Sequence, residues 1–191
     1  MIAVGHSLSD HSYVANGGTI DRAEIRAELK RARTEFHRLL AEAERNDAWI
    51  APTRGTRWNN EQLLLHMVFG YMLVQRLLLL VHLFGRLPEP FSRVFARVLN
   101  AATKPFHPVN YYGSCAAALY YNRRRMGAKL DRVIASINRK LAKETGESWR
   151  RGMHFPTGWD PFFTDYMTLE DVYRYPGKHF DFHAQQLTLN S

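Results

Sequence analysis

The chain has 191 residues, of which 46% are hydrophobic and 23% are charged. This composition fits one globular domain with a sizeable core and excludes extensive disorder beyond the N terminus. The net charge of +8 raises nucleic acid as a partner. However, the basic residues are dispersed and no nucleic-acid-binding motif accompanies them, so we expect no specific nucleic-acid partner.

Residues 1–18 are predicted to be a flexible lead-in, and residues 19–191 a single domain. The first residues lack the basic and apolar regions of a signal peptide. The single cysteine, Cys115, has no partner for an intrachain disulfide. This favours a reducing, cytoplasmic setting.

The first helix is predicted over residues 19–44. Asp21, followed three residues later by Glu24, resembles a capping box, and apolar residues then recur at helical spacing. Pro52 and Gly55 lie in the segment that breaks this pattern.

A second helix is predicted to begin after Asn59, which is followed by Gln62 in a capping pattern, and to stop at Gly85. Residues 63–84 approach the length of a membrane span. Polar side chains interrupt the apolar run: His66, Gln75, Arg76 and His82. Because an arginine within a span is costly, we expect a buried helix of a soluble protein and no membrane partner.

The middle of the chain predicts a short extra helix at 91–102, an irregular segment at 105–113 and a third long helix at 114–145, ending at Gly146. Residues 147–166 form an aromatic loop in this interpretation. The last helix is capped by Thr168 and Asp171, is broken or kinked at Pro176 and Gly177, and then carries His179 and His183. Four main helices without a strand signal predict an all-α four-helix bundle.

The last helix places His179 and His183 four residues apart, on one face. This spacing lets two imidazoles reach one ion, although many helices carry such a pair on their wet side. His66 lies on the apolar stripe of the second helix, where a lone histidine is usually a core residue. Together the three imidazoles suit a metal site with open positions, which is typical of catalysis. Since the ligands must be neutral, occupancy is expected to fall below about pH 6.

Two segments resemble the DinB/YfiT-like superfamily: "RWNNEQLLLHMVFGYMLVQRLL" and "HFDFHAQQL". The resemblance covers roughly residues 20–190. It implies an up-down-down-up four-helix bundle with a divalent metal, often zinc or nickel, on His66, His179 and His183. The extra helix at 91–102 and the Pro176–Gly177 break depart from the simplest members.

Characterised members of this superfamily include thiol-dependent S-transferases and maleylpyruvate isomerases. The resemblance therefore implies a metal that activates a low-molecular-weight thiol towards a small-molecule electrophile. The alternative is a non-catalytic, stress-associated protein that binds a metal or ligand. A homodimer is compatible with either interpretation.

Several side chains near the histidines have two interpretations each. Trp159 and Phe162 either roof a pocket or pack in the core. Asp160 either orients a ligand histidine or a bound water, or caps a turn. Gln186 either bonds near the metal or caps the end of the bundle. Residues 123–125, three arginines, either meet an anionic substrate or form a solvated helix face, and we favour the solvated face.

Cys115 is the rival nucleophile to a metal-activated thiol. Its neighbours in "YYGSCAAALYY" are small and apolar apart from the tyrosines. These surroundings favour an inert, packed thiol.

Overall fold

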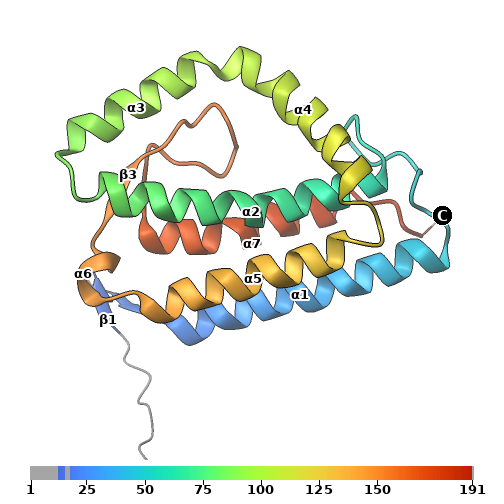
Figure 1. Cartoon of the computed structure of the whole chain (residues 1–191), viewed down its shortest axis with the longest axis horizontal. Helices are drawn as coiled ribbons and strands as arrows, with labels where there is room; N and C mark the ends of the chain where they lie inside the picture. Colours follow the sequence, from blue (N-terminus) through green and yellow to red (C-terminus); the bar gives the residue numbers. More distant parts are fainter. Residues whose placement is uncertain (1–12, 16–17, 191) are drawn as a thin grey trace, which may run out of the picture.

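The computed structural model describes residues 13–15 and 18–190, and this part of the chain is mostly helical (Figure 1). The N-terminal lead-in expected at residues 1–18 lies largely outside these residues. The helices are α1 (Arg22–Arg45), α2 (Asn60–Phe84), α3 (Glu89–Ala101), α4 (Thr103–Tyr120), α5 (Met126–Lys143), α6 (Gly146–Trp149) and α7 (Leu169–Ala184).

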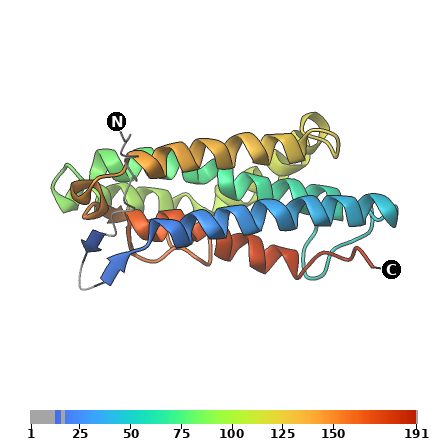
Figure 2. The same ribbon diagram turned by 90° about the horizontal axis from the view of Figure 1, so that it is seen from below.

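Four of these helices, α1, α2, α5 and α7, pack side by side. α2 contacts α7 and α5, and α1 contacts the same two helices. α1 and α7 run in one direction and α2 and α5 in the other (Figure 1). α3 and α4 form an outer layer that carries the chain back along the molecule, which is why α5 runs parallel to α2. Figure 2 shows α1, α2, α5 and α7 lying along one long axis.

Side-chain caps start three of the packed helices where the sequence predicts them. Asp21 accepts hydrogen bonds from the first turn of α1. Asn59 and Gln62 form a complete capping box at α2, and Thr168 and Asp171 form another at α7. Each box satisfies two backbone N–H groups that a helix N terminus leaves without partners. The cap positions therefore fix where α2 and α7, the two helices with the histidines, begin.

Aromatic side chains join α1, α2 and α7 in the core. The ring centroid of Phe180 lies 6.5 Å from that of Phe36 and 6.4 Å from that of Tyr71, both in edge-to-face geometry. All three side chains are almost fully buried. Such pairs stabilise by about 0.5–1.5 kcal/mol beyond the burial of their area.

Within the described residues, α2 is the one helix long and apolar enough to cross a membrane. However, 61% of its most apolar window is buried inside the structure. Burial by neighbouring helices favours a core helix over a membrane span, in line with the expectation from its interrupting polar residues.

The middle of the chain differs from the prediction. The segment expected to be irregular, residues 105–113, belongs to α4. Pro105 lies in the first turn of α4, where backbone N–H groups have no hydrogen-bond partner within the helix. Only Pro108 therefore removes a hydrogen bond from the helix. The predicted short helix at 91–102 corresponds to α3, and α4 then extends the outer layer.

The predicted long helix at 114–145 is also wrong, because the chain leaves the helical conformation between α4 and α5. The side chain of Asn122 accepts a hydrogen bond from the backbone N–H of Arg124, at 3.2 Å. This Asx-turn offers the backbone an alternative to helical bonding, and it separates the two helices. Gly146 does not end α5 but begins α6.

Pro176 and Gly177 were expected to break or kink the last helix, and they do not break it, since α7 continues through both residues. Pro176 in a helix interior costs about 3 kcal/mol. The buried residues of α7 on both sides of Pro176 pack on α2 and offset that cost. His179 and His183 therefore lie on the same continuous helix that Thr168 and Asp171 cap.

Two small antiparallel sheets appear where no strand was predicted. β1 (Tyr13–Ala15) pairs with β2 (Gly18–Ile20), and β3 (Gly152–His154) pairs with β4 (Tyr166–Thr168). Each strand has three residues, too few to show the alternating pattern that identifies a strand in sequence. The second sheet gathers the predicted aromatic loop into a hairpin that leads directly into α7.

Candidate metal centre

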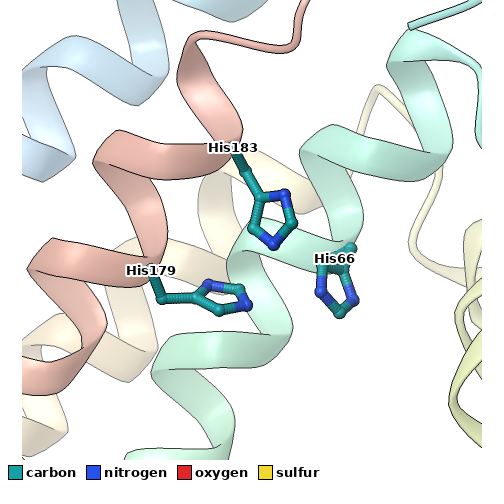
Figure 3. Close-up of side chains that lie close together, drawn as sticks. All are labelled: His66, His179 and His183. Carbon is teal, nitrogen blue, oxygen red and sulfur yellow. The ribbon is translucent and has the colours of Figure 1, made fainter. Parts of the chain in front are cut away.

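The three histidines singled out in the sequence meet between α2 and α7. One ring nitrogen from each of His66, His179 and His183 lies within 4.8 Å of the others. The three residues are 8%, 4% and 9% exposed, respectively. The ring centroids are 4.5–5.0 Å apart, and Figure 3 shows the rings pointing towards one another. The structure therefore brings together the residues that the two helix patterns predicted to converge.

Gly70, one turn after His66 on α2, makes room for the ring of His179. A Cβ atom on Gly70 would lie 2.6 Å from Nδ1 of His179 and 3.0 Å from its Cε1. Only glycine lets the ring lie this close to the α2 backbone. Sequence analysis missed this residue, and the one signal was a glycine within an otherwise large, apolar helix.

Hydrogen bonds to the outer nitrogens orient two of the rings. Nδ1 of His183 lies 2.7 Å from Oε1 of Gln186, and Nδ1 of His66 lies 3.4 Å from Oγ of Ser114 on α4. The backbone carbonyl of Gln186 accepts a hydrogen bond from the backbone N–H of Arg54, at 2.8 Å, and this bond holds Gln186 in place. With Nδ1 engaged in this way, Nε2 of His66 and of His183 is left for another partner. Of the two interpretations of Gln186, the structure places its side chain on a histidine of the site.

His179 has a different environment. Its Nδ1 is buried and has no hydrogen-bond partner in the described part of the chain. Its Nε2 lies 4.0 Å from Oδ2 of Asp160, too far for a hydrogen bond. Burying Nδ1 without a hydrogen-bond partner costs free energy in the folded state.

Of the two roles weighed for Asp160, the structure shows the turn cap, whereas the carboxylate only faces the histidines. Oδ1 accepts the N–H of Phe162, at 2.8 Å, which is a turn-capping bond. Oδ2 accepts a hydrogen bond from the hydroxyl of Tyr175, also at 2.8 Å, and faces His179. The carboxylate is thus fixed at the edge of the histidine cluster, without bonding to a ring nitrogen.

Burial keeps the three imidazoles neutral. Desolvation, with a smaller contribution from His183, lowers the pKa of His66 to about 3. Desolvation also holds the pKa of His179 well below its usual value, with further contributions from the other two histidines. The pKa of His183 is lowered by desolvation too, although Gln186 and Asp160 oppose that shift. A neutral imidazole is the form that binds a metal ion.

Trp58 closes one side of the cluster. Its ring stacks on His66 with centroids 4.3 Å apart, and its edge approaches His183 at 6.5 Å. Tyr111 of α4 lies against the same indole at 6.1 Å. These rings exclude water from one flank, and Trp58 is a second site residue to which sequence analysis gave no role of its own.

The other aromatic candidates lie further out. Nε1 of Trp159 donates a hydrogen bond to the carbonyl of Leu99, at 2.7 Å, so the indole ties its loop to α3. Phe162 packs edge-on against Phe182, which neighbours His183. The hydrogen bond of Trp159 favours the packing interpretation. Phe162 approaches the histidines only through Phe182.

The remaining candidates lie on α4 and at its end. Cys115 is half-buried on α4, next to Ser114. Residues 123–125 lie in the connection from α4 to α5, and two of them line a surface groove.

Comparisons with protein-family models, with curated proteins and with solved structures found no match for this chain.

Proposed function

We propose that the chain is a DinB/YfiT-like four-helix bundle formed by α1, α2, α5 and α7. In chain order, α1 runs in one direction, α2 and α5 run in the opposite direction, and α7 runs in the first direction again (Figure 1). This is an up-down-down-up order. The two motifs that carry the resemblance lie on α2 and α7, which pack against each other. α3 and α4 are additions outside this bundle.

We further propose that His66, His179 and His183 hold one divalent ion, zinc or nickel, through their Nε2 atoms. The observation that carries this proposal is the convergence of three buried, neutral imidazoles within 4.8 Å. An ideal tetrahedral site with bonds of 2.0–2.1 Å separates its ligand nitrogens by about 3.3 Å, so the nitrogens have to approach one another by up to about 1.5 Å to bind one ion. Nδ1 of His179, on the other side of that ring, has no hydrogen-bond partner among the described residues and would stay without one.

The activity that suits such a site is thiol transfer or isomerisation. A divalent ion, when bound, lowers the pKa of a thiol so that the thiolate is available near neutral pH. Oδ2 of Asp160, held by Tyr175, is placed to accept the proton that the thiol releases. Trp58 and the surrounding core keep water away from the reacting sulfur.

The second candidate is a bundle that holds metal without turnover. The low exposure of all three histidines favours it, because a substrate must reach the open positions of a catalytic ion. The two candidates share the metal site and differ only in whether a small molecule reacts there.

A thiol-consumption assay distinguishes them. The metal-loaded protein is mixed with glutathione and 1-chloro-2,4-dinitrobenzene, and its rate is compared with those of His179→Ala and Cys115→Ala. We expect consumption above background for the wild type and Cys115→Ala, and background for His179→Ala. A His179→Ala rate equal to that of the wild type would exclude the metal mechanism. Background rates throughout, repeated with mycothiol and bacillithiol, would favour the non-catalytic candidate.

A further inference from the structure

A basic groove lies between α2, the start of α5 and the connection from α4 to α5. Its volume is about 680 Å³. Four cationic side chains line it, together with two adjacent tyrosines: Arg124, Arg125, Lys129, Arg132, Tyr120 and Tyr121. Figure 1 shows the connection from α4 to α5 at the end of the molecule opposite α6. The groove is therefore built from a break in the helices that the sequence did not predict.

No carboxylate of the described residues pairs with the cations of this groove. None of its lining residues is acidic, and within the described part of the chain none of the four cations forms an ion pair. The neighbouring groove between α1 and α5 differs, because Asp131 lies in it and pairs with Arg33 at 2.6 Å and with His37 at 2.9 Å. Uncompensated charge of one sign in a concave surface attracts an anion.

The backbone adds to the positive potential. α5 starts at Met126, and its N-cap residue, Arg125, provides no side-chain cap. The N–H of Met126 donates to the backbone carbonyl of Asn122, at 3.1 Å, and the start of this 18-residue helix presents the positive end of the helix dipole without a side-chain cap. Ala128, in the first turn, lines the groove. A phosphate group is the anion that such a helix start and several arginines together bind best.

The ring of Tyr120 supplies a planar surface beside the cations, and the ring of Tyr121 lies perpendicular to it, with centroids 4.8 Å apart. Tyr120 is 63% exposed. The guanidinium of Arg125 lies 5.3 Å from the ring centroid of Tyr120, and Nζ of Lys129 lies 5.0 Å from that of Tyr121. Exposed aromatic rings beside cations bind nucleobases by stacking. The groove thus offers a stacking surface and a phosphate-binding surface side by side.

We infer that this groove binds a nucleoside polyphosphate, with its phosphates at the start of α5 and its base on Tyr120. The volume suits one small molecule. The groove is separate from the histidine cluster, because Gln75 of the groove follows His66 by nine residues, about 13 Å along α2. The inference is independent of the proposed metal chemistry.

Calorimetric titration with adenosine triphosphate at 0.15 M salt tests it. The groove variant, Lys129→Ala with Arg132→Ala, is compared with a control, Arg139→Ala with Lys140→Ala, which removes the same charge from α5 outside the groove. We expect the groove variant to weaken binding about tenfold or more, and the control less than about twofold. Thermal unfolding checks that both variants fold. Absence of saturable binding by the wild type, or equal losses in both variants, would overturn the inference.

Further titrations separate the parts of the site. Tyr120→Ala should weaken binding of adenosine triphosphate but not of inorganic tripolyphosphate, and an unchanged affinity for the nucleotide would refute the stacking role. His66→Ala should bind the nucleotide like the wild type, whereas loss of binding would place the ligand at the histidines instead. Tighter binding of a ten-nucleotide single strand through the same residues would replace the mononucleotide with a nucleic acid.

Discussion

Replacing Gly70 with alanine tests the geometry of the candidate metal centre without removing a ligand. The added Cβ would lie 2.6 Å from Nδ1 of His179 and 3.3 Å from its Cγ. The imidazole is a rigid ring enclosed by Tyr175 and the other two histidines, so it has little room to retreat.

The required movement is large on the scale of metal coordination. Ordinary contact begins near 3.4 Å, so the ring of His179 has to move by about 0.8 Å, whereas metal–ligand distances tolerate only about 0.2 Å. We expect Gly70→Ala to lower metal affinity by at least the 10- to 100-fold typical of disturbing a ligand's support. Stability should change less, because a gain in helix propensity of about 1 kcal/mol opposes an overpacking cost of about 1–3 kcal/mol.

The matched control is Gly177→Ala on α7, where an added Cβ meets nothing within 4 Å. This variant should keep wild-type metal affinity and gain up to about 1 kcal/mol of stability. Competition with a chromogenic chelator measures affinity, and urea denaturation measures stability. Wild-type metal affinity in Gly70→Ala would refute the idea that His179 binds an ion while its ring lies against Gly70.

Three further outcomes follow from the surroundings of the site. Gln186→Ala removes the acceptor of His183 and should weaken metal binding about 10- to 100-fold in chelator competition, and an unchanged affinity would contradict that orienting role. Asp160→Asn should retain metal but slow thiol consumption, and a wild-type rate would remove Asp160 from proton transfer. The metal-free protein should lose stability as the pH falls below about 6.5, because the lowered histidine pKa values mean that the unfolded chain binds more protons. Each histidine contributes at most about 1.4 kcal/mol per pH unit, and urea denaturation showing stability that rises towards pH 5 would contradict the pKa directions.

The same pKa directions revise the expected pH limit of metal binding. An imidazole with an ordinary pKa would be protonated, and would release the metal, below about pH 6. Because burial lowers the pKa of His66 to about 3, protons compete for that ring only at lower pH. Metal retention should therefore extend below pH 6, to the pH at which the histidine whose pKa is lowered least becomes protonated.

Local signals in the sequence predicted the starts of α1, α2 and α7 correctly. The boxes at Asn59 and Thr168 depend only on residues three apart, so they can be recognised without the fold. The meeting of His66 with the α7 pair was also predictable, because helical periodicity puts each on a face that has to turn inwards.

Features that depend on tertiary packing could not be predicted in this way. The prolines of α4 and Pro176 of α7 were interpreted as breaks, but their positions in each helix and the packing of α7 on α2 allow the helices to continue. The role of Gly70 depends on how closely α7 approaches α2, which spacing along one helix does not specify.

Metal content of the protein purified without an affinity tag is the most direct test of the central claim. Elemental analysis should find about one zinc or nickel ion per chain in the wild type, since three imidazoles form one site. His66→Ala, His179→Ala and His183→Ala should each lose most of it while remaining folded. A wild-type protein that contains no metal and takes up neither ion when supplied with it would contradict the account.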